Sequence, residues 1–424
     1  MKSIVSLLLI ASIALSAPKY IVLNSLGETL SMGEWLSPPA NNLTTVEAIP
    51  NQILADDDGI WVLSSGAGAV QRFTVSGASI SLVEQFALPA GSNPYLMHKT
   101  GGMVYASLWV SGGIGIIDIG TGHVTATDSF CLGPQGIFAN EDYIFVTAGN
   151  LDPISFTYGV GELWRLSPDG TPIDFIEIGT NPQEIIESPL GDLHIVCTGD
   201  YFSTWGIVYV VDTASFSVID SIPLGGSPQR LALDSYTGII YSATSMWGEL
   251  GSGKLLAYDG RTREILWDAS SSGNSLTGTG IVGLAAHNGY IFLPSMDSST
   301  VEMCFVDRVT MTLTRIGEHP TGHGPLDVAL LYETGISETH LPRKTAISIS
   351  PSPFNSVCEI VAPFEIRDAF VRDLTGRTIE KLPSRSISGN RAYWAPAEET
   401  PSGVYLIEAR GKFKTGLGRV VFLK

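Results

Sequence analysis

The stretch VYVVDTASFSVIDSIPLGGSPQRLALD, residues 208–234, decides the fold. It holds an apolar, β-branched run that closes on an aspartate, then a more polar run, then a Gly/Pro turn followed by a short apolar run. Short runs bounded by glycine, proline and aspartate are typical of strands joined by tight turns. The stretch therefore predicts three consecutive short strands.

The same pattern recurs along most of the chain. A run of strand type occurs seven times, with start-to-start steps of 40, 44, 40, 50, 45 and 52 residues. The seven runs are YIVLNS (20–25), IWVLSS (60–65), VYASLW (104–109), IFVTAG (144–149), HIVCTG (194–199), IIYSAT (239–244) and IFLPSM (291–296). Each is followed by a second strand, a more polar third strand and a turn that leads into a short apolar strand. Four strands repeated seven times predict an all-β fold, a seven-bladed β-propeller.

The two ends of the repeat region complement each other. The chain begins with the second, third and fourth strands of a blade (20–25, 29–34 and 43–49), and the missing innermost strand comes only at 326–331. We therefore expect a propeller closed by N- and C-terminal strands of one blade, which leaves no open sheet edge between the first and last blades.

Residues 19–332 resemble the YVTN-type seven-bladed propeller repeats. The resemblance rests on IFVTAGN (144–150), GTNPQEI (179–185) and the stretch 208–234, whereas GTGIVGLAA (278–286) departs from it because it lacks the proline. The resemblance implies the fold but not the function, since related propellers include binding scaffolds, lactonases and dehydrogenase subunits. Function has to be argued from the site.

The N-terminus predicts a signal peptide within residues 1–17. Lys2 supplies the positive charge, Ile4 to Leu15 form an apolar stretch too short to span a bilayer, and Ala14 and Ser16 suit cleavage after Ser16. A buried N-terminal strand is the alternative. We expect the propeller to cover 18–332, without a transmembrane segment, and a linker to cover 333–346.

The last segment, 347–424, has short alternating runs with frequent turns, which predict a small Ig-like β-sandwich. It resembles the C-terminal sorting domain of the type IX (Por) secretion pathway through PSPFN (351–355), DLTGR (373–377), Trp394 and PSGVYLIEA (401–409). The resemblance implies a secretion translocon as partner and a secreted or outer-membrane cell-surface location in a Gram-negative bacterium. An ordinary structural module is the alternative.

Charge and motifs exclude several classes of function. Residues 1–340 contain 11 Lys and Arg against 34 Asp and Glu, a balance of −23, which argues against nucleic-acid binding. No GxSxG, HExxH or GxxxxGK[ST] motif occurs, and GxGxxG at Gly278, Gly280 and Gly283 does not stand between a strand and a helix. We expect no cofactor, no metal and no catalytic residue, and buried free thiols at the scattered cysteines.

Propeller topology directs attention to one face, where the loops between strands two and three and the turns between blades emerge together. The predicted ligand-binding residues there are Gln52, Tyr95, Gln135, Gln183, Gln229 and Asp327 on the turns, and Trp109, Tyr158, Tyr201, Trp205 and Trp247 on the loops. Amides and aromatics suit glycans or peptides. The alternative interpretation is that these turn residues only cap the strands.

Three functions remain open from the sequence. The first is a surface-displayed binding protein for a glycan or peptide, and the second is a lactonase-like hydrolase or lyase, for which Asp327 and Glu184 are the nearby acids. The third is a structural protein of the surface layer.

Overall fold

The computed structural model describes residues 18–56, 58–152, 154–244, 253–332, 344–351, 354–362, 365–372, 378–397, 400–411 and 415–424. The predicted signal peptide, the linker up to residue 343 and Trp247 lie outside these residues. The chain divides into two compact units, Met1–Gly335 and Ile336–Lys424.

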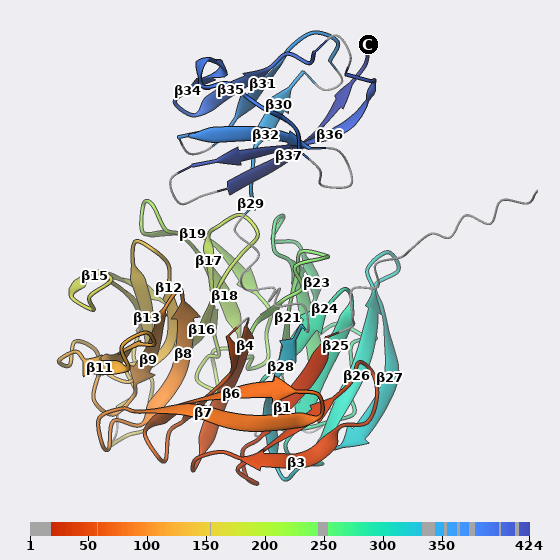
Figure 1. The fold of residues 1–424 in the computed structure, drawn as a ribbon. Coiled ribbons are helices and arrows are strands. Elements are labelled where there is room, and N and C mark those ends of the chain that lie inside the picture. The colour runs from red at the N-terminus through yellow and green to blue at the C-terminus, as the bar shows by residue number, and fades with distance from the viewer. Residues whose placement is uncertain are drawn as a thin grey trace, which may run out of the picture. The chain divides into compact units, whose positions relative to one another are not determined.

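The described part of the first unit contains seven four-stranded antiparallel sheets, numbered here in chain order (Figure 1). Sheet 1 contains β28 (Pro325–Leu331), β1 (Lys19–Asn24), β2 (Thr29–Gly33) and β3 (Ala40–Thr45). Sheet 2 contains β4 (Pro50–Asp56), β5 (Gly59–Ser64), β6 (Ala69–Ser76) and β7 (Ser79–Ala87). Sheet 3 contains β8 (Pro94–Thr100), β9 (Met103–Leu108), β10 (Gly113–Asp118) and β11 (His123–Ala126). Sheet 4 contains β12 (Pro134–Ala139), β13 (Ile144–Ala148), β14 (Gly161–Leu166) and β15 (Pro172–Ile178).

The remaining three sheets continue the same order. Sheet 5 contains β16 (Pro182–Glu187), β17 (Leu193–Cys197), β18 (Ile207–Asp212) and β19 (Ser217–Pro223). Sheet 6 contains β20 (Ala232–Leu233), β21 (Ile239–Thr244), β22 (Lys254–Asp259) and β23 (Ile265–Trp267). Sheet 7 contains β24 (Ala285–His287), β25 (Tyr290–Ser295), β26 (Thr300–Asp307) and β27 (Thr312–Pro320). The all-β prediction is confirmed.

The seven predicted strand-type runs coincide with the second strand of each sheet, from β1 to β25. These strands are buried along almost their whole length, as in β13 and β21, because each sheet packs against neighbours on both faces. Burial on both faces explains why the runs are continuously apolar instead of alternating. The outer strands, such as β19, are largely exposed and correspondingly polar.

The two ends of the first unit meet in sheet 1. β28 pairs antiparallel with β1, from Lys19 opposite Leu331 to Asn24 opposite Pro325. The innermost strands of neighbouring sheets also contact one another, with β28 against β4, β4 against β8, β8 against β12, β12 against β16, and β24 against both β20 and β28. The pairing closes the edge that β1 would otherwise expose.

Polar side chains tie adjacent sheets together where the innermost strands begin. Five of these strands start with a Pro-x-y-apolar motif, and the same motif directly precedes β20. We call the third residue of the motif, y, the clasp position. At three clasp positions the side chain accepts a hydrogen bond from the backbone N–H of the apolar residue in the next sheet's motif. The bonds join Asp327 Oδ2 to Ile53 N (3.1 Å), Gln52 Oε1 to Met97 N (2.6 Å) and Glu184 Oε2 to Leu231 N (2.6 Å). Each bond satisfies a buried donor that would otherwise lack a partner.

Glycine stands at the clasp position of β12 and, in the proline-free segment before β24, at Gly283, because the next strand approaches too closely for a side chain. A Cβ at Gly136 would overlap the carbonyl oxygen of Gln183, and one at Gly283 would overlap the carboxyl group of Asp327. The last glycine of the GxGxxG run therefore serves close packing.

Hydroxyl groups on the second strands make a further set of bonds between sheets. The bonds run from Ser107 Oγ to Gln135 O (2.5 Å), from Thr147 Oγ1 to Gln183 O (3.0 Å) and from Thr198 Oγ1 to Pro228 O (2.8 Å). Each donor is buried and reaches the innermost strand of the following sheet. The same bond from one sheet to the next thus recurs across sheets 3 to 6.

Acidic residues tie the sheets at the opposite end of the innermost strands. Lys99 Nζ of sheet 3 lies 2.7 Å from Asp56 Oδ2 of sheet 2, and both side chains are buried. Between sheets 5 and 6, Asp192 Oδ2 accepts a 2.7 Å bond from Arg263. Desolvation opposes the ionisation of Asp192, but hydrogen bonds with His194, Ser188 and Arg263 hold its pKa well below its usual range.

The second unit consists of two sheets around one hydrophobic core. One sheet contains β29 (Lys344–Ala346), β37 (Thr415–Phe422), β36 (Gly403–Arg410), β32 (Asp368–Arg372) and β33 (Thr378–Lys381). The other contains β30 (Ser348–Ser350), β31 (Cys358–Val361), β35 (Arg391–Trp394) and β34 (Ile387–Ser388), and a 3-10 turn, η2 (Ser384–Ser386), precedes β34. Phe354, Trp394, Tyr405 and Phe422 form the aromatic centre of the core. β29 begins inside the predicted linker because Lys344–Ala346 pairs in parallel with β37.

Replacing the clasp glycine Gly136 by alanine should destabilise the first unit. The added Cβ would force β12 away from β16, and overpacking of this kind costs about 1–3 kcal/mol. Urea unfolding followed by tryptophan fluorescence should show the lower free energy of unfolding. Gly102→Ala is the matched control, because its Cβ would meet nothing within 4 Å. Equal stability of the two variants would refute the close approach at the clasp position.

Candidate functional site

Hydrogen bonds connect side chains from three successive innermost strands to Asn181, two of them directly and the third through Gln183. Tyr95 on β8 donates its hydroxyl to Gln183 Oε1 (3.2 Å). The side-chain nitrogens of Gln135 on β12 and Gln183 on β16 both donate to Asn181 Oδ1, at 3.0 and 2.7 Å. Gln135, Gln183 and Asn181 are buried, so these bonds hold the amides in fixed orientations.

Two loop tyrosines complete this network. Tyr158, between β13 and β14, pairs with Leu151 across its own loop, and Tyr201 lies between β17 and β18. Their ring centroids are 6.4 Å apart, and the hydroxyl of Tyr201 lies 3.5 Å from Asn181 Nδ2. We call Tyr95, Gln135, Tyr158, Asn181, Gln183 and Tyr201 the phenol–amide cluster.

Burial keeps the three phenols of the cluster protonated. Desolvation, with Tyr201 and Tyr95 close by, raises the pKa of Tyr158 to about 12. Desolvation also raises the pKa of Tyr95, although the positive charge of Arg230 opposes this, and it raises the pKa of Tyr201. The phenols can therefore donate hydrogen bonds at any physiological pH.

Charged residues gather beside this cluster where the innermost strands meet. Arg230, just before β20, lies 3.3 Å from Glu184 Oε1 and donates to the backbone oxygen of Asn51 at 3.2 Å, which links sheet 6 to sheet 2. Desolvation raises the pKa of Glu184 and of Asp327, and the charge of Arg230 opposes both shifts. We call Glu184, Arg230 and Asp327 the axial ion cluster.

The structure brings together five of the predicted site residues, namely Tyr95, Gln135, Tyr158, Gln183 and Tyr201. Gln52 and Asp327 occupy clasp positions, where each has an oxygen bonded to the next sheet. Gln229 and Trp109 are half-buried, and Trp109 lies against Gly133. Trp205 is 46% exposed and lines a separate groove.

Sequence reasoning missed two residues on which the site depends, Asn181 and Arg230. Asn181 stands before the proline of GTNPQEI and has a positive φ of 54°, which asparagine tolerates well. Arg230 is the clasp residue of GGSPQRL. Arg230 is the one basic residue at a clasp position, and this was the available signal in the sequence. Only the tertiary structure places it beside Glu184.

The two loops that carry Tyr158 and Tyr201 also carry exposed apolar side chains. Ile154 (88% exposed) and Phe156 (75%) belong to the β13–β14 loop, and Phe202 (87%) belongs to the β17–β18 loop. Apolar side chains gathered on loops around fixed polar groups are typical of a ligand-binding face.

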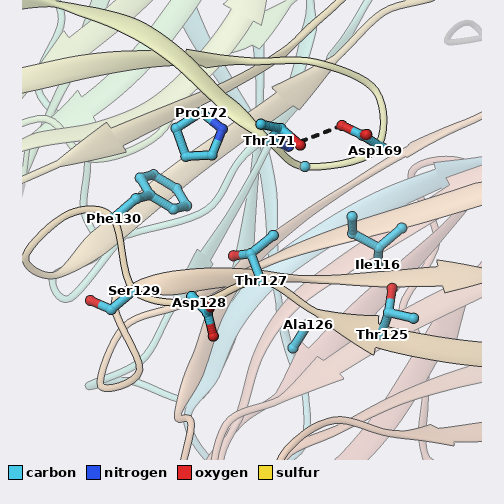
Figure 2. A pocket seen from close by; sticks show the side chains of 11 residues that line it. Ile116, Thr125, Ala126, Thr127, Asp128, Ser129, Phe130, Asp169, Thr171 and Pro172 are labelled. Atoms are coloured by element: carbon cyan, nitrogen blue, oxygen red, sulfur yellow. Dashed lines mark hydrogen bonds between the residues drawn. The ribbon is translucent and has the colours of Figure 1, made fainter.

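A separate hollow is lined by other residues of the first unit. A groove of about 660 Å³ runs between the outer part of sheet 3 and the β14–β15 turn of sheet 4 (Figure 2). Phe130 and Pro172 line it together with Thr171, whose backbone N–H donates to Asp169 Oδ1 at 3.1 Å. None of its lining residues belongs to the phenol–amide cluster.

Among the described residues, no group of three or more His, Cys, Asp or Glu side chains is arranged to hold a metal ion. The four cysteines are free thiols, and burial raises the pKa of Cys304 to about 12. The described part of the chain contains no helix of the length and hydrophobicity needed to cross a membrane.

Comparison with solved structures identifies the architecture. A putative 6-phosphogluconolactonase from Bacteroides uniformis is 13% identical and matches 74% of this chain and 99% of its own, with a TM-score of 0.60. The likeness shows a β-propeller-like fold. The periplasmic gluconolactonase PpgL of Pseudomonas aeruginosa is 11% identical over 74% of this chain and 98% of its own, with a TM-score of 0.57. No family model and no curated protein matches the sequence.

Proposed function

We propose that this chain is a secreted or cell-surface-displayed binding protein that holds a glycan or peptide at the phenol–amide cluster. In this proposal the seven sheets are the blades of one closed propeller of the YVTN type. The observation that carries it is the group of protonated phenols and fixed amides beneath exposed aromatic loops. The half-buried phenols offer donors and acceptors to a polar ligand, and the buried amides that bond to Tyr95 and Tyr201 hold these two phenols in place.

The fixed orientation of the cluster favours binding over loose surface contact. Asn181 Oδ1 already accepts from both glutamines, and the clasp bonds hold the innermost strands on which they stand. These polar side chains are already ordered before a ligand binds. Binding therefore does not cost their conformational entropy, and the affinity is higher. The exposed loop aromatics Phe156 and Phe202 add apolar area around the polar centre.

Removing the loop phenols should weaken binding. We expect a purified full-length chain to bind a component of a glycan and peptide array, and the double variant Tyr158→Phe, Tyr201→Phe to bind it about tenfold more weakly, since each lost hydrogen bond contributes about 0.5–1.5 kcal/mol. Titration calorimetry with and without a calcium chelator measures the change.

The double variant Tyr236→Phe, Tyr393→Phe is the control, because these tyrosines are exposed and lie outside the cluster. Unchanged affinity in the cluster variant would remove this site from the proposal. A blank array would favour a structural role in the surface layer instead.

A second candidate is lactone hydrolysis at the axial ion cluster. It is favoured by two buried carboxyl groups with raised pKa beside Arg230, in a fold similar to that of proteins named as lactonases. Glu184 Oε1 would accept a proton from a water molecule that attacks the lactone carbonyl, and Arg230 would stabilise the oxyanion. As the ring C–O bond breaks, protonated Glu184 gives this proton to the leaving ring oxygen, which yields the hydroxy acid and restores the carboxylate.

Glucono-δ-lactone is the substrate for testing this candidate, with acid release followed in a pH-stat. Glu184→Gln should reduce the rate at least a hundredfold, as expected for loss of a general base. Glu177→Gln, at an exposed position on β15, is the control and should leave the rate unchanged. A wild-type chain that does not accelerate the hydrolysis would rule this function out.

We further propose that residues 1–17 and the second unit direct export. The support is the motif resemblance of 347–424 together with a separate two-sheet unit of Ig-like size and its own core. Deleting 344–424 should prevent surface display in a type IX-secreting bacterium, measured by protease treatment of intact cells. Display of the truncated chain would contradict a sorting role.

A further inference from the structure

A second hollow opens beside Trp205, apart from the phenol–amide cluster. It measures about 480 Å³ and is lined by three segments: Trp205 itself, the turn Pro223–Gly226, and residues Asp268–Ser270. Trp205 lies on the β17–β18 loop and is 46% exposed. One broad apolar ring face is thus available to a ligand beside a polar edge.

Backbone hydrogen bonds fix these three segments to one another. Gly225 N donates to Gly206 O, next to Trp205, and Ala269 N donates to Leu224 O, both at 2.8 Å. Lys254 Nζ holds the third segment by donating to the backbone oxygens of Ala269 and Ser271. The groove is therefore formed before a ligand arrives.

Glycine keeps the floor of the groove open. Gly225 has a positive φ of 71°, and a Cβ there would lie 3.1 Å from Cβ of Ala269. Without that side chain, a flat ligand can approach the backbone between Trp205 and Asp268.

Asp268 supplies a charged acceptor at the edge of the groove. Its Oδ1 accepts hydrogen bonds from Ser270 and from the hydroxyl of Ser271. These bonds lower the pKa of Asp268, so that the group is ionised at neutral pH. None of these bonds uses Oδ2, which can accept from a ligand.

We propose that this groove is a sugar-binding subsite, in which a neutral pyranose ring stacks on Trp205 and donates a hydroxyl to Asp268 Oδ2. A pyranose has the two surfaces that the groove complements, an apolar face of C–H groups and an edge of hydroxyl donors. Uronic acids are disfavoured, because Asp268 and the acidic body of the chain repel a carboxylate. The inference rests on the proposed binding function and assigns it a neutral glycan.

The sugar-binding subsite is tested by titration calorimetry with the full-length protein. The four ligands are cellohexaose, laminarihexaose, chitohexaose and hexagalacturonic acid. At least one neutral hexasaccharide should bind and the acidic one should not. Trp205→Ala should weaken binding at least tenfold, equivalent to about 1.4 kcal/mol, whereas Trp205→Tyr should retain most of the affinity. Asp268→Asn should weaken binding several-fold.

Phe175→Ala is the matched control, because Phe175 is 47% exposed on the outer strand β15. Neutral-sugar binding that survives Trp205→Ala but is lost in Tyr158→Phe, Tyr201→Phe would overturn the subsite and leave the proposed function standing. Binding of peptides but of no hexasaccharide would likewise overturn only the glycan assignment. Failure of every sugar and peptide to bind would overturn both.

Discussion

The structure of the first unit depends on hydrogen bonds that cross from one sheet to the next at the start of the innermost strands. Asp327, Gln52 and Glu184 each accept the backbone N–H of the following motif, and Gly136 and Gly283 allow the next strand to come close. Backbone groups buried between packed sheets need partners, and a side chain from the neighbouring sheet supplies one without disturbing the ladder within either sheet. The position of each four-stranded repeat is therefore fixed by hydrogen bonds to the neighbouring sheets as well as by the pairing of its own strands.

The same constraint positions the candidate site. The residue before the clasp residue lies at the start of the same innermost strand. Tyr95, Gln135 and Gln183 occupy this place in three consecutive sheets. Both glutamines bond to Asn181, and Tyr95 bonds to Gln183. A geometry needed for packing thus gathers polar side chains from distant parts of the chain.

The axial ion cluster and the groove at Trp205 differ in their distribution of charge. The axial ion cluster places Glu184 and Asp327 beside Arg230 in a desolvated setting, where burial raises the pKa of both acids. The groove at Trp205 holds a single ionised carboxyl group near the surface, with a pKa lowered by neighbouring serines. The first setting suits proton transfer, and the second suits a fixed acceptor for hydroxyl groups.

The sequence alone determined the seven strand-type runs, the Gly/Pro turns and the return of the chain to its first sheet, because these follow from local periodicity and from the order of repeats. It also located Tyr95, Gln135 and Gln183 on equivalent turns. The sequence did not distinguish Gln52 and Asp327, whose bonds tie adjacent sheets, from the three residues of the phenol–amide cluster on those turns. Side chains one position apart along a strand point in different directions. The contacts of Asn181 and Arg230 and the groove beside Trp205 were decided only by tertiary structure, because packing between sheets joins groups that are distant along the chain. Gln135 and Asn181 are 46 residues apart, and Asn51 and Arg230 are 179 residues apart. The groove likewise combines Trp205 with Asp268 of the next sheet.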